Sequence, residues 1–430
     1  MIYLDSAATS LIKPDFVKER LIENFYKIGN PSRGFNEISL DSLHMVLDTR
    51  KKLARFFNIR DPRQIAFTSN ATEALNIAIN SFVGKDDHVI TSVIDHNSVL
   101  RPLYLKEKEG AELSFIDFKD RKEGILAYES IEGLIKENTK AIIISHVSNV
   151  TGNITDLDFI SKICKKHNLL LIVDCAQSAG LIDIDVERYA IDCLCFTGHK
   201  ALLALQGIGG IYIREGLNPK AIKVGGSGFS SFDKNHPSKM PDALEAGTPN
   251  GHGILSLNAS LDYINSVGLS DIRKKDLDLL TYFSQRLEEI PDIEIFGDRD
   301  LSKRVGIVSL RSLKIPSDRL AQILSDKYGI ATRSGAHCAP LCHKALGTEA
   351  CGLIRFSFSY FNEKEEIDQV ISALKEILGD NYDSNNIWYD YWCYDDGGFR
   401  QRKWFCWHLN SYTKCGVCWL WPSLWGGNYW

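Results

Sequence analysis

The 430-residue chain predicts an α/β fold: a largely parallel sheet covered by helices on both faces, followed by a smaller α+β domain. Short apolar runs alternate with helix-like segments up to residue 214, which is typical of βαβ units. Several of these runs end in polar residues, and the alternation gives way near residue 255 to a long helix-like segment. Ligands of such sheets gather beyond the carboxyl ends of the strands, so the polar residues there are candidates for a functional site.

The alternation sets the order of the elements. Strands are expected at 64–68, 88–93, 112–117, 141–147, 169–174, 193–197 and 209–214, and helices at 70–82, 97–108 and 156–167. A helix at 256–267 opens the α+β stretch, whose last helix is expected at 363–378. We therefore expect an N-terminal segment (1–14) packing on the small domain, a large domain (15–255), a small C-terminal domain (256–380) and a tail (381–430).

The tail differs in composition from the rest of the chain. All eight tryptophans lie between residues 388 and 430. A metal knuckle of Cys415 and Cys418 with His408 and Cys406, or an interfacial tryptophan anchor, are two functional alternatives. However, the cysteines form no second CxxC pair, and the tail lacks helical periodicity. We therefore interpret it as a disordered or artefactual extension.

Composition limits the partners. A net charge of -5 and a pI near 6.1 argue against nucleic acid as the main partner. Asp5 stands where a signal peptide would be basic, and no apolar run approaches the roughly 20 residues of a membrane span. We therefore expect a cytoplasmic protein with no membrane partner. Four of the eleven cysteines lie in or beside apolar segments and predict buried thiols, not disulfides: Cys164, Cys175, Cys193 and Cys195.

Asp174 and Lys200 are the most informative residues, because each follows an apolar run and the runs are neighbours in the chain. A lysine amine can form a Schiff base with the aldehyde of pyridoxal phosphate (PLP), and a carboxylate can keep the pyridine nitrogen protonated. The alternatives are a solvated lysine and a helix-capping aspartate. Asn70 and Glu73 are spaced as a capping box, so free N–H groups and the Thr72 hydroxyl would face an anion. The alternative there is an ordinary capped helix.

Nine short motifs in order resemble the class V aminotransferase-fold enzymes, specifically cysteine desulfurases of the Suf-like group, with selenocysteine lyases as relatives. They are YLDSAAT (3–9), NPSRG (30–34), NATE (70–73), DHNS (95–98), SNVTG (148–152), VDCAQ (173–177), TGHK (197–200), EAGTPN (245–250) and RSGAHCAP (333–340). The resemblance implies PLP-dependent fold type I, PLP (pyridoxal 5'-phosphate) as cofactor and a homodimer. The aromatic tail has no counterpart in the family pattern.

The resemblance also implies roles for single residues around the PLP ring. Lys200 would hold the cofactor and move the Cα proton, and Asp174 would pair with the pyridinium nitrogen. Gln177 would hydrogen-bond the ring oxygen. His96 would lie against the ring face, with a role in stacking or proton transfer; the alternative is a surface histidine at a helix start.

The phosphate would be held at the other end of the cofactor. Thr72, Thr197 and His199 are the implied phosphate ligands, and Ala71 at the predicted helix start is an implied cofactor-binding residue. Thr248 would reach the phosphate of the partner subunit across the dimer interface.

Cys338 is the implied nucleophile. Its thiolate would take sulfur from the substrate, and nearby cations, here Arg333 and His337, favour a thiolate. Asn149 would bind both the cofactor, near its ring oxygen, and the substrate carboxylate. Arg333 and Arg355 would bind the substrate; the alternative for Arg355 is an edge-strand charge.

Cys342 and His343 follow Cys338 and suggest zinc. A fourth ligand is not evident, so no metal is expected and Cys342 is interpreted as a packed or resolving thiol.

The sequence supports three hypotheses. The first is a homodimeric PLP-dependent cysteine desulfurase that converts L-cysteine to L-alanine and leaves a persulfide on Cys338, supplying a sulfur-acceptor protein for iron–sulfur cluster or thio-cofactor assembly. The second keeps the fold and the cofactor but prefers L-selenocysteine. The third is a catalytically silent scaffold that binds a sulfur carrier.

Overall fold

The computed structural model describes residues 1–31, 36–228, 232–379, 389–394 and 400–405. Residues 1–378 form one compact unit and residues 379–430 a second. In the second unit, β16 (Tyr389–Tyr394) and β17 (Arg400–Phe405) pair as antiparallel strands, which the sequence analysis did not predict. The proposed knuckle residues Cys406, His408, Cys415 and Cys418 lie outside the described residues.

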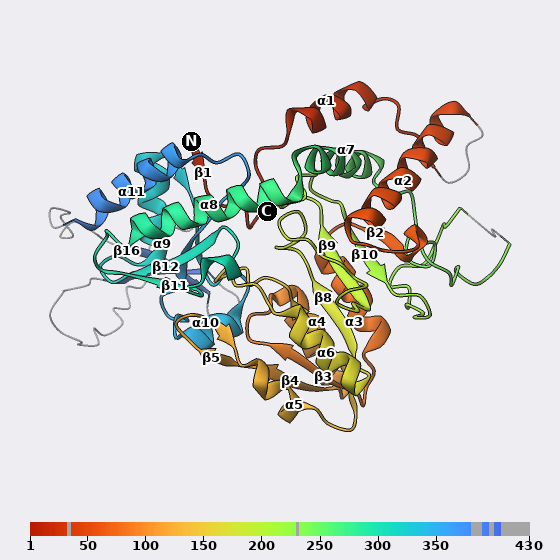
Figure 1. Cartoon of the computed structure of the whole chain (residues 1–430), viewed down its shortest axis with the longest axis horizontal. Coiled ribbons are helices and arrows are strands. Elements are labelled where there is room, and N and C mark those ends of the chain that lie inside the picture. The colour runs from red at the N-terminus through yellow and green to blue at the C-terminus, as the bar shows by residue number, and fades with distance from the viewer. Residues whose placement is uncertain (32–35, 229–231, 380–388, 395–399, 406–430) are drawn as a thin grey trace, which may run out of the picture. The chain divides into compact units, whose positions relative to one another are not determined.

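The large sheet of the first unit contains seven described strands in the order β2-β10-β9-β8-β7-β3-β4 (Figure 1). Their bounds are β2 Ile65–Thr68, β10 Gly209–Ile213, β9 Cys193–Thr197, β8 Leu170–Asp174, β7 Thr139–Ser145, β3 His88–Ser92 and β4 Glu112–Ile116. The strands from β9 to β4 are parallel to one another, and β10 is antiparallel to both of its neighbours. The predicted α/β class with a mostly parallel sheet is confirmed.

Helices cover both faces of this sheet, as the alternation of its buried residues shows. Ile142, Leu171 and Leu194 belong to one core with α2 (Glu37–Phe56), α6 (Leu157–His167) and α7 (Gly251–Val267). Their neighbours Ile143, Ile172 and Cys193 belong to a second core with α3 (Ala71–Phe82) and α4 (Asn97–Glu109). Since successive strand side chains point to opposite faces, these apolar runs are buried on both sides. The cysteines predicted to be packed thiols are buried and free.

The predicted elements differ from the observed ones mainly at their ends. The helix expected at 256–267 begins at Gly251, because the Asn250 side chain accepts the Gly253 N–H (3.0 Å) and caps it. The expected domain boundary between residues 255 and 256 therefore lies inside α7. The large domain also contains α1 (Asp15–Asn24), α5 (Ile131–Leu134), and the short strands β5 (Phe118–Asp120) and β6 (Ile125–Leu126).

A second sheet carries the C-terminal part of the unit. Its described strands are antiparallel in the order β11-β12-β15-β14, with bounds Ile293–Phe296, Ile307–Ser312, Leu353–Ser357 and Arg333–Gly335. The helices of this part are α8 (Leu269–Leu287), α9 (Ser317–Tyr328), α10 (Pro340–Leu346) and α11 (Lys364–Leu378). The N-terminal segment joins it, because β1 (Ile2–Tyr3) pairs in parallel with β13 (Ile330–Ala331).

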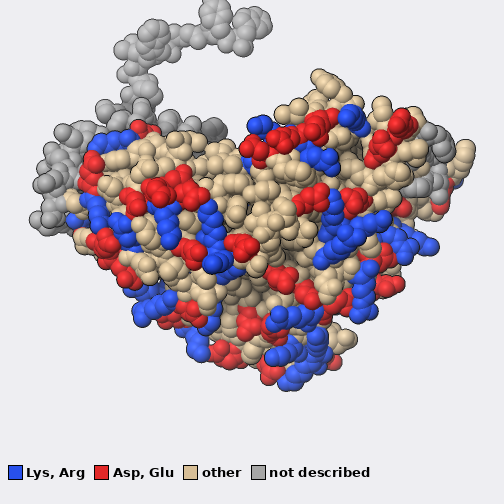
Figure 2. Space-filling model, turned by 45° about the horizontal axis from the view of Figure 1, so that its top comes forward, with Lys and Arg blue, Asp and Glu red and all other residues tan. Residues whose placement is uncertain are grey.

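The surface mixes charges of both signs. On the face in Figure 2, Lys and Arg side chains are interspersed with Asp and Glu side chains. Among the described helices, none is both long enough and apolar enough to cross a membrane.

Candidate active site

The candidate site lies at the carboxyl end of the large sheet, where the predicted residues meet. One pocket is lined by Ala71, Thr72, His96, Asn149, Asp174, Gln177, Thr197, His199 and Lys200. Asp174 and Thr197 are the last residues of β8 and β9, and the others follow a strand after a short loop. The strands other than β10 run in one direction and end at the same edge, so these residues meet there. The predicted cofactor residues are thus brought together, with Thr248 as the exception.

Asp174 and Lys200 are electrostatically coupled. Burial lowers the pKa of Lys200 to about 8, although the charge of Asp174 acts in the opposite direction. Burial also raises the pKa of Asp174 to about 6, opposed by the Ala176 N–H, which donates to its carboxylate at 2.9 Å. Lys200 therefore offers far more neutral, nucleophilic amine at neutral pH than an ordinary lysine, and Asp174 is ionised.

The start of α3 lines the same pocket. The Asn70 side chain accepts the Glu73 N–H (3.0 Å), as predicted, but Glu73 does not close the capping box. Its carboxylate instead accepts the Ser69 N–H (2.6 Å) and pairs with Lys223. The Thr197 hydroxyl, buried in the same pocket, has no hydrogen-bond partner among the described residues. Helix-start N–H groups and an unused buried hydroxyl are what a phosphate needs.

His96 caps α4 and lines the pocket. Its Nδ1 accepts the Ser98 N–H (3.0 Å), so the neutral ring carries its proton on Nε2. Burial, and next the charge of Lys200, lower the pKa of His96 to about 4. His96 is therefore a neutral ring at the pocket wall, with a backbone contact that fixes its tautomer.

The N-terminal segment holds the other side of the pocket. Gln177 donates to the Ala7 carbonyl (3.0 Å), and His199 Nδ1 lies 3.0 Å from the Thr9 hydroxyl. Burial lowers the pKa of His199 to about 4, so this histidine is neutral as well. Lys13 donates to the His199 carbonyl (3.1 Å). Sequence analysis assigned Lys13 no role, although it stands only four residues after the YLDSAAT motif.

Asp95 was also missed. It is fully buried and accepts hydrogen bonds from Thr91, Ser92 and Ser145, including the Ser145 N–H (2.7 Å). Burial raises its pKa, and its charge in turn raises the pKa of Asp174. Asp95 ties the ends of β3 and β7 together beneath the pocket. An acid between an apolar run and a predicted helix, in the DHNS motif, was the signal that could have found it.

The Cys338 loop faces this pocket from the small domain. Cys338 is exposed, and both His337 and Cys338 have left-handed backbone, with φ of 51° and 56°. Non-glycine residues in this conformation cost on the order of 1–3 kcal/mol each and persist only where contacts hold them. Here the His337 carbonyl accepts from the Asn149 amide (2.8 Å), and the Cys338 carbonyl accepts the Asn97 N–H (2.7 Å). The loop is therefore fastened to the large domain at the pocket rim.

The expectation that His337 acts as a cation beside Cys338 is wrong. Burial lowers the pKa of His337 to about 3, so its ring is neutral. Of the two cations predicted near Cys338, only Arg333, which is exposed, is charged. Cys342 is a packed thiol: burial raises its pKa to about 12. The described residues contain no group of three or more His, Cys, Asp or Glu side chains placed to hold a metal.

Arg355 lies on β15, an inner strand of the small sheet, so the edge-strand alternative is wrong. It is 2% exposed and donates to Asp5 (2.8 Å) and to the Asn149 carbonyl (3.0 Å). Its Nε and the Asn149 side-chain oxygen are buried without a hydrogen-bond partner in the described chain. Arg333 pairs with Arg355 across β14 and β15. Two arginines at opposed positions favour an anion between the strands and the pocket.

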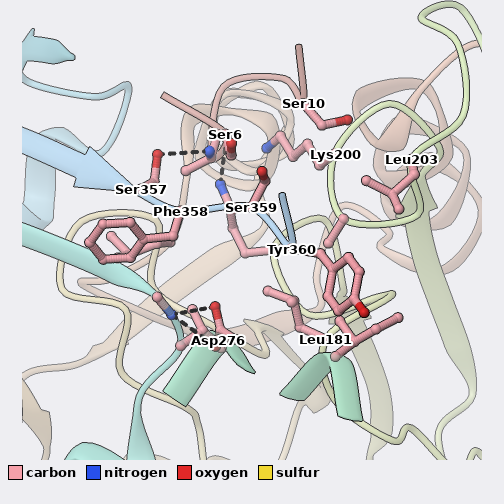
Figure 3. A pocket seen from close by; sticks show the side chains of 17 residues that line it. Ser6, Ser10, Leu181, Lys200, Leu203, Asp276, Ser357, Phe358, Ser359 and Tyr360 are labelled. Carbon is pink, nitrogen blue, oxygen red and sulfur yellow. Dashed lines mark hydrogen bonds between the residues drawn. The ribbon is translucent and has the colours of Figure 1, made fainter. Parts of the chain in front are cut away.

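Lys200 also lines a second cavity, between the large sheet and the small domain (Figure 3). Ser6 of the N-terminal segment and Phe358 and Tyr360, which follow β15, line it as well. On its floor, the Asp276 carboxylate accepts the Gly306 N–H at 3.0 Å. Lys200 therefore lies where the N-terminal segment, the large sheet and the small domain meet.

Thr248 lies elsewhere. It lines a separate and larger groove with Arg50, Lys223 and Glu245. Glu245 holds that groove together, because its carboxylate pairs with Arg50 and accepts the Phe67 N–H (2.7 Å). The groove also contains Ser69 and Glu73, so it adjoins the start of α3, but Thr248 itself does not line the pocket of Lys200. Part of the NPSRG motif, residues 32–34, lies outside the described residues.

The pocket fits PLP in each of its three parts. Lys200 matches the aldehyde, Asp174 matches the pyridine nitrogen, and the start of α3 with Thr197 matches the phosphate. His96 lines the same pocket.

Comparisons with known proteins agree with this site. The class V aminotransferase family matches residues 2–370. A probable cysteine desulfurase of Borreliella burgdorferi is 35% identical, over 88% of this chain and 92% of the relative, and a cysteine desulfurase of Salmonella dublin is 32% identical, over 88% and 93%.

Solved structures of cysteine desulfurases are also similar to this chain. The apo cysteine desulfurase of Thermococcus onnurineus superimposes with a TM-score of 0.82 at 32% identity, over 88% of this chain and 94% of that one. The cysteine desulfurase CsdA of Escherichia coli gives 0.78 at 27% identity, over 87% and 94%. The predicted family and its dependence on PLP are confirmed: this chain belongs to the class V aminotransferases.

Proposed function

We propose that this chain is a PLP-dependent cysteine desulfurase that moves the sulfur of L-cysteine onto Cys338 and releases L-alanine. One observation carries the proposal. The loop that exposes Cys338 is hydrogen-bonded to Asn149 and Asn97, at the rim of the pocket that contains Lys200 and Asp174. The shared name of the relatives supports the same activity.

Lys200 and Asp174 act on the cofactor and on the Cα proton. When bound, PLP accepts the electron pair that is released as the Cα–H bond of the substrate breaks. Lys200 holds the cofactor and then carries the Cα proton on Nζ, a task suited to an amine whose pKa is about 8. Asp174, ionised at neutral pH, holds a proton on the ring nitrogen.

Cys338 performs the sulfur step. Its thiolate attacks the substrate sulfur, so an S–S bond forms as the C–S bond breaks, and the electron pair of the C–S bond stays with carbon. The carbon fragment takes up protons and leaves as L-alanine. The persulfide on Cys338 holds the sulfur, so no external oxidant or reductant is needed.

The substrate carboxylate binds at the arginine pair. Arg355 has a buried Nε without a partner in the described chain, and Arg333 stands opposite it across the strands. Asn149 links this pair to the pocket, because its side-chain amide donates to the His337 carbonyl of the Cys338 loop and its backbone carbonyl accepts from Arg355. Binding the carboxylate there places the substrate sulfur on the side of Cys338.

A second copy of the chain completes the phosphate site. Thr248 lines a groove beside the start of α3 and not the pocket of its own chain, and the resemblance of the EAGTPN motif supports a role for Thr248 at the partner's phosphate across a two-fold interface. A sulfur-acceptor protein, feeding iron–sulfur cluster or thio-cofactor assembly, then takes the persulfide sulfur from the exposed loop. A cytoplasmic location remains a prediction.

The test is a thiol comparison in the PLP-loaded protein. Cys338→Ala should bind PLP at Lys200 normally, form no persulfide and release alanine from L-cysteine at least about 100-fold more slowly, since the nucleophile is lost. Cys351→Ala is the matched control, because Cys351 is the other exposed free cysteine among the described residues. Cys351→Ala should still form the persulfide and release alanine at the wild-type rate. Mass spectrometry after brief exposure to L-cysteine should locate the added sulfur on Cys338; sulfur on Cys351 or a wild-type rate in Cys338→Ala would overturn the proposal.

A further inference from the structure

A chain of buried hydrogen bonds runs behind the Cys338 loop. His337 Nε2 lies 3.2 Å from the Arg333 carbonyl, His337 Nδ1 lies 3.4 Å from His343 Nε2, and His343 Nδ1 lies 2.8 Å from the Thr348 hydroxyl. His337 is 4% exposed, His343 1% and Thr348 0%. These three side chains form what we call the histidine relay. None of the roles described above uses His343 or Thr348.

The direction of each hydrogen bond is fixed. The Arg333 carbonyl can only accept, so His337 carries its proton on Nε2 and its Nδ1 is an acceptor. His343 must then donate from Nε2, so its Nδ1 is an acceptor; the Thr348 hydroxyl lies 2.8 Å from this Nδ1 and 3.5 Å from the His343 carbonyl, and the shorter contact is the one that completes the relay. Burial lowers the pKa of both histidines, in agreement with two neutral rings. Each polar atom of the relay is satisfied in this one arrangement.

The relay joins the two ends of the segment that exposes the nucleophile. It starts at Thr348, just after α10, passes through His343 on that helix and ends on the backbone of Arg333 in β14. Between these anchors lie His337 and Cys338, both in left-handed backbone. Asn149 and Asn97 of the large domain hydrogen-bond the two backbone carbonyls of His337 and Cys338, whereas the relay holds the His337 side chain.

We infer that His343 is a positioning residue for sulfur transfer. By donating to His337, it holds the left-handed His337–Cys338 backbone and the Arg333 backbone in one register, so the thiol and the carboxylate-binding arginine keep a fixed separation. This inference rests on the proposed function. His343 touches neither cofactor nor substrate, and its effect should therefore appear in the sulfur step and not in the Cα step.

The test separates those two steps. In PLP-loaded protein, His343→Leu should slow single-turnover persulfide formation on Cys338 by about 10- to 100-fold. Exchange of the Cα hydrogen of L-alanine in D2O, which needs Lys200 and not Cys338, should stay within about twofold of wild type. His343→Gln, whose amide can still donate to His337, should recover most of the persulfide rate. Lys344→Gln, an exposed neighbour on α10, is the control and should match wild type.

A readout without turnover covers variants that fold poorly. In the cofactor-free protein, trypsin cleavage after Arg333 reports local opening of this loop. Cleavage should be several-fold faster in His343→Leu and Thr348→Val than in wild type, and near wild type in His343→Gln. The inference is overturned if His343→Leu forms persulfide at the wild-type rate, if alanine exchange falls as much as persulfide formation, or if His343→Gln fails as badly as His343→Leu. If the wild-type protein places no sulfur on Cys338, the proposed function is refuted. The trypsin result would still test separately whether His343 holds the Cys338 loop.

Discussion

The cofactor pocket and the Cys338 loop are built by different means. The pocket is formed by the ends of the strands of one sheet and by the helices that follow them. Regular secondary structure therefore sets the positions of its residues. The Cys338 loop has two consecutive left-handed residues, and it is held by contacts from Asn97, Asn149 and the histidine relay. The function of the cofactor pocket therefore depends on the sheet, and the function of the Cys338 loop depends on a few long-range hydrogen bonds.

This difference predicts how each region responds to change. Altering a pocket side chain should remove a chemical step while its surroundings keep their shape, because the sheet is buried on both faces. Altering a contact of the loop should change geometry first and chemistry second, because strained backbone persists only where contacts hold it. The predictions below test this separation.

The largest effect is expected for Lys200→Ala. This variant should lose the covalent link to PLP, seen as loss of the absorbance band of the linked cofactor. It should also release alanine about 10⁴-fold more slowly or worse, since both the covalent link and the proton carrier are lost. Trypsin cleavage after Arg333 should be unchanged, because the loop does not depend on Lys200. The matched control is Lys13→Ala, which removes an amine beside His199 and should keep the covalent link. A Lys200→Ala protein that retains link and turnover would contradict the assignment.

The two regions also differ in how far the sequence could predict them. Asp174, Lys200 and the start of α3 were predicted because strand ends and helix caps are local signals in the chain. Arg355 and Cys338 were reached only through the family resemblance. The relay and the neutral state of His337 were missed, since both arise from burial by residues far apart in sequence. The incomplete capping box at Glu73 has the same origin, a tertiary pairing with Lys223.

The next effect is on cofactor loading. Because the neutral amine reacts, the rate at which PLP links to Lys200 should rise with pH with a midpoint near pH 8, not near the 10.4 of an ordinary lysine. Asp174→Asn removes the charge that raises the pKa of Lys200, so the midpoint should move to lower pH. Stopped-flow absorbance of the cofactor-free protein measures both midpoints. A shift to higher pH in Asp174→Asn would show that the carboxylate does not act on Lys200 by its charge.

A smaller effect is expected where the N-terminal segment holds Arg355. Asp5→Asn leaves a buried guanidinium without its carboxylate, so the free energy of unfolding should fall by about 2 kcal/mol. The charge of Asp5 also raises the pKa of Lys200, but less than the charge of Asp174 does, so the midpoint of cofactor loading should move to lower pH by less than in Asp174→Asn. Asp15→Asn, which removes an exposed acid paired with an exposed lysine, should change stability by less than about 0.5 kcal/mol. Urea unfolding of wild type, Asp5→Asn and Asp15→Asn measures these changes. An equal loss of unfolding free energy in both variants would contradict the prediction.

The smallest effect compares one buried histidine from each region. His146 follows β7 beneath the pocket and His337 belongs to the loop, and burial lowers their pKa values to about 4 and about 3. An unfolded histidine, with a pKa near 6.5, gains a proton below that pH while these two do not. Each should therefore destabilise the fold by about 0.7 kcal/mol as the pH falls from 7 to 6.

The raised pKa values of Asp174 and Asp276 act in the opposite direction below pH 7, so the pH dependence of the wild type alone does not isolate the histidines. Comparing wild type with His146→Gln isolates the effect of His146. Between pH 7 and pH 6, the free energy of unfolding measured in urea should fall by about 0.7 kcal/mol more in wild type than in His146→Gln. His337→Gln should give the same difference if the docked loop opens only with the whole fold. A clearly smaller value for His337 would mean that the loop opens on its own and admits protons while the sheet stays folded. Such a result would show that the contacts of the loop are weaker than the backbone that forms the cofactor pocket.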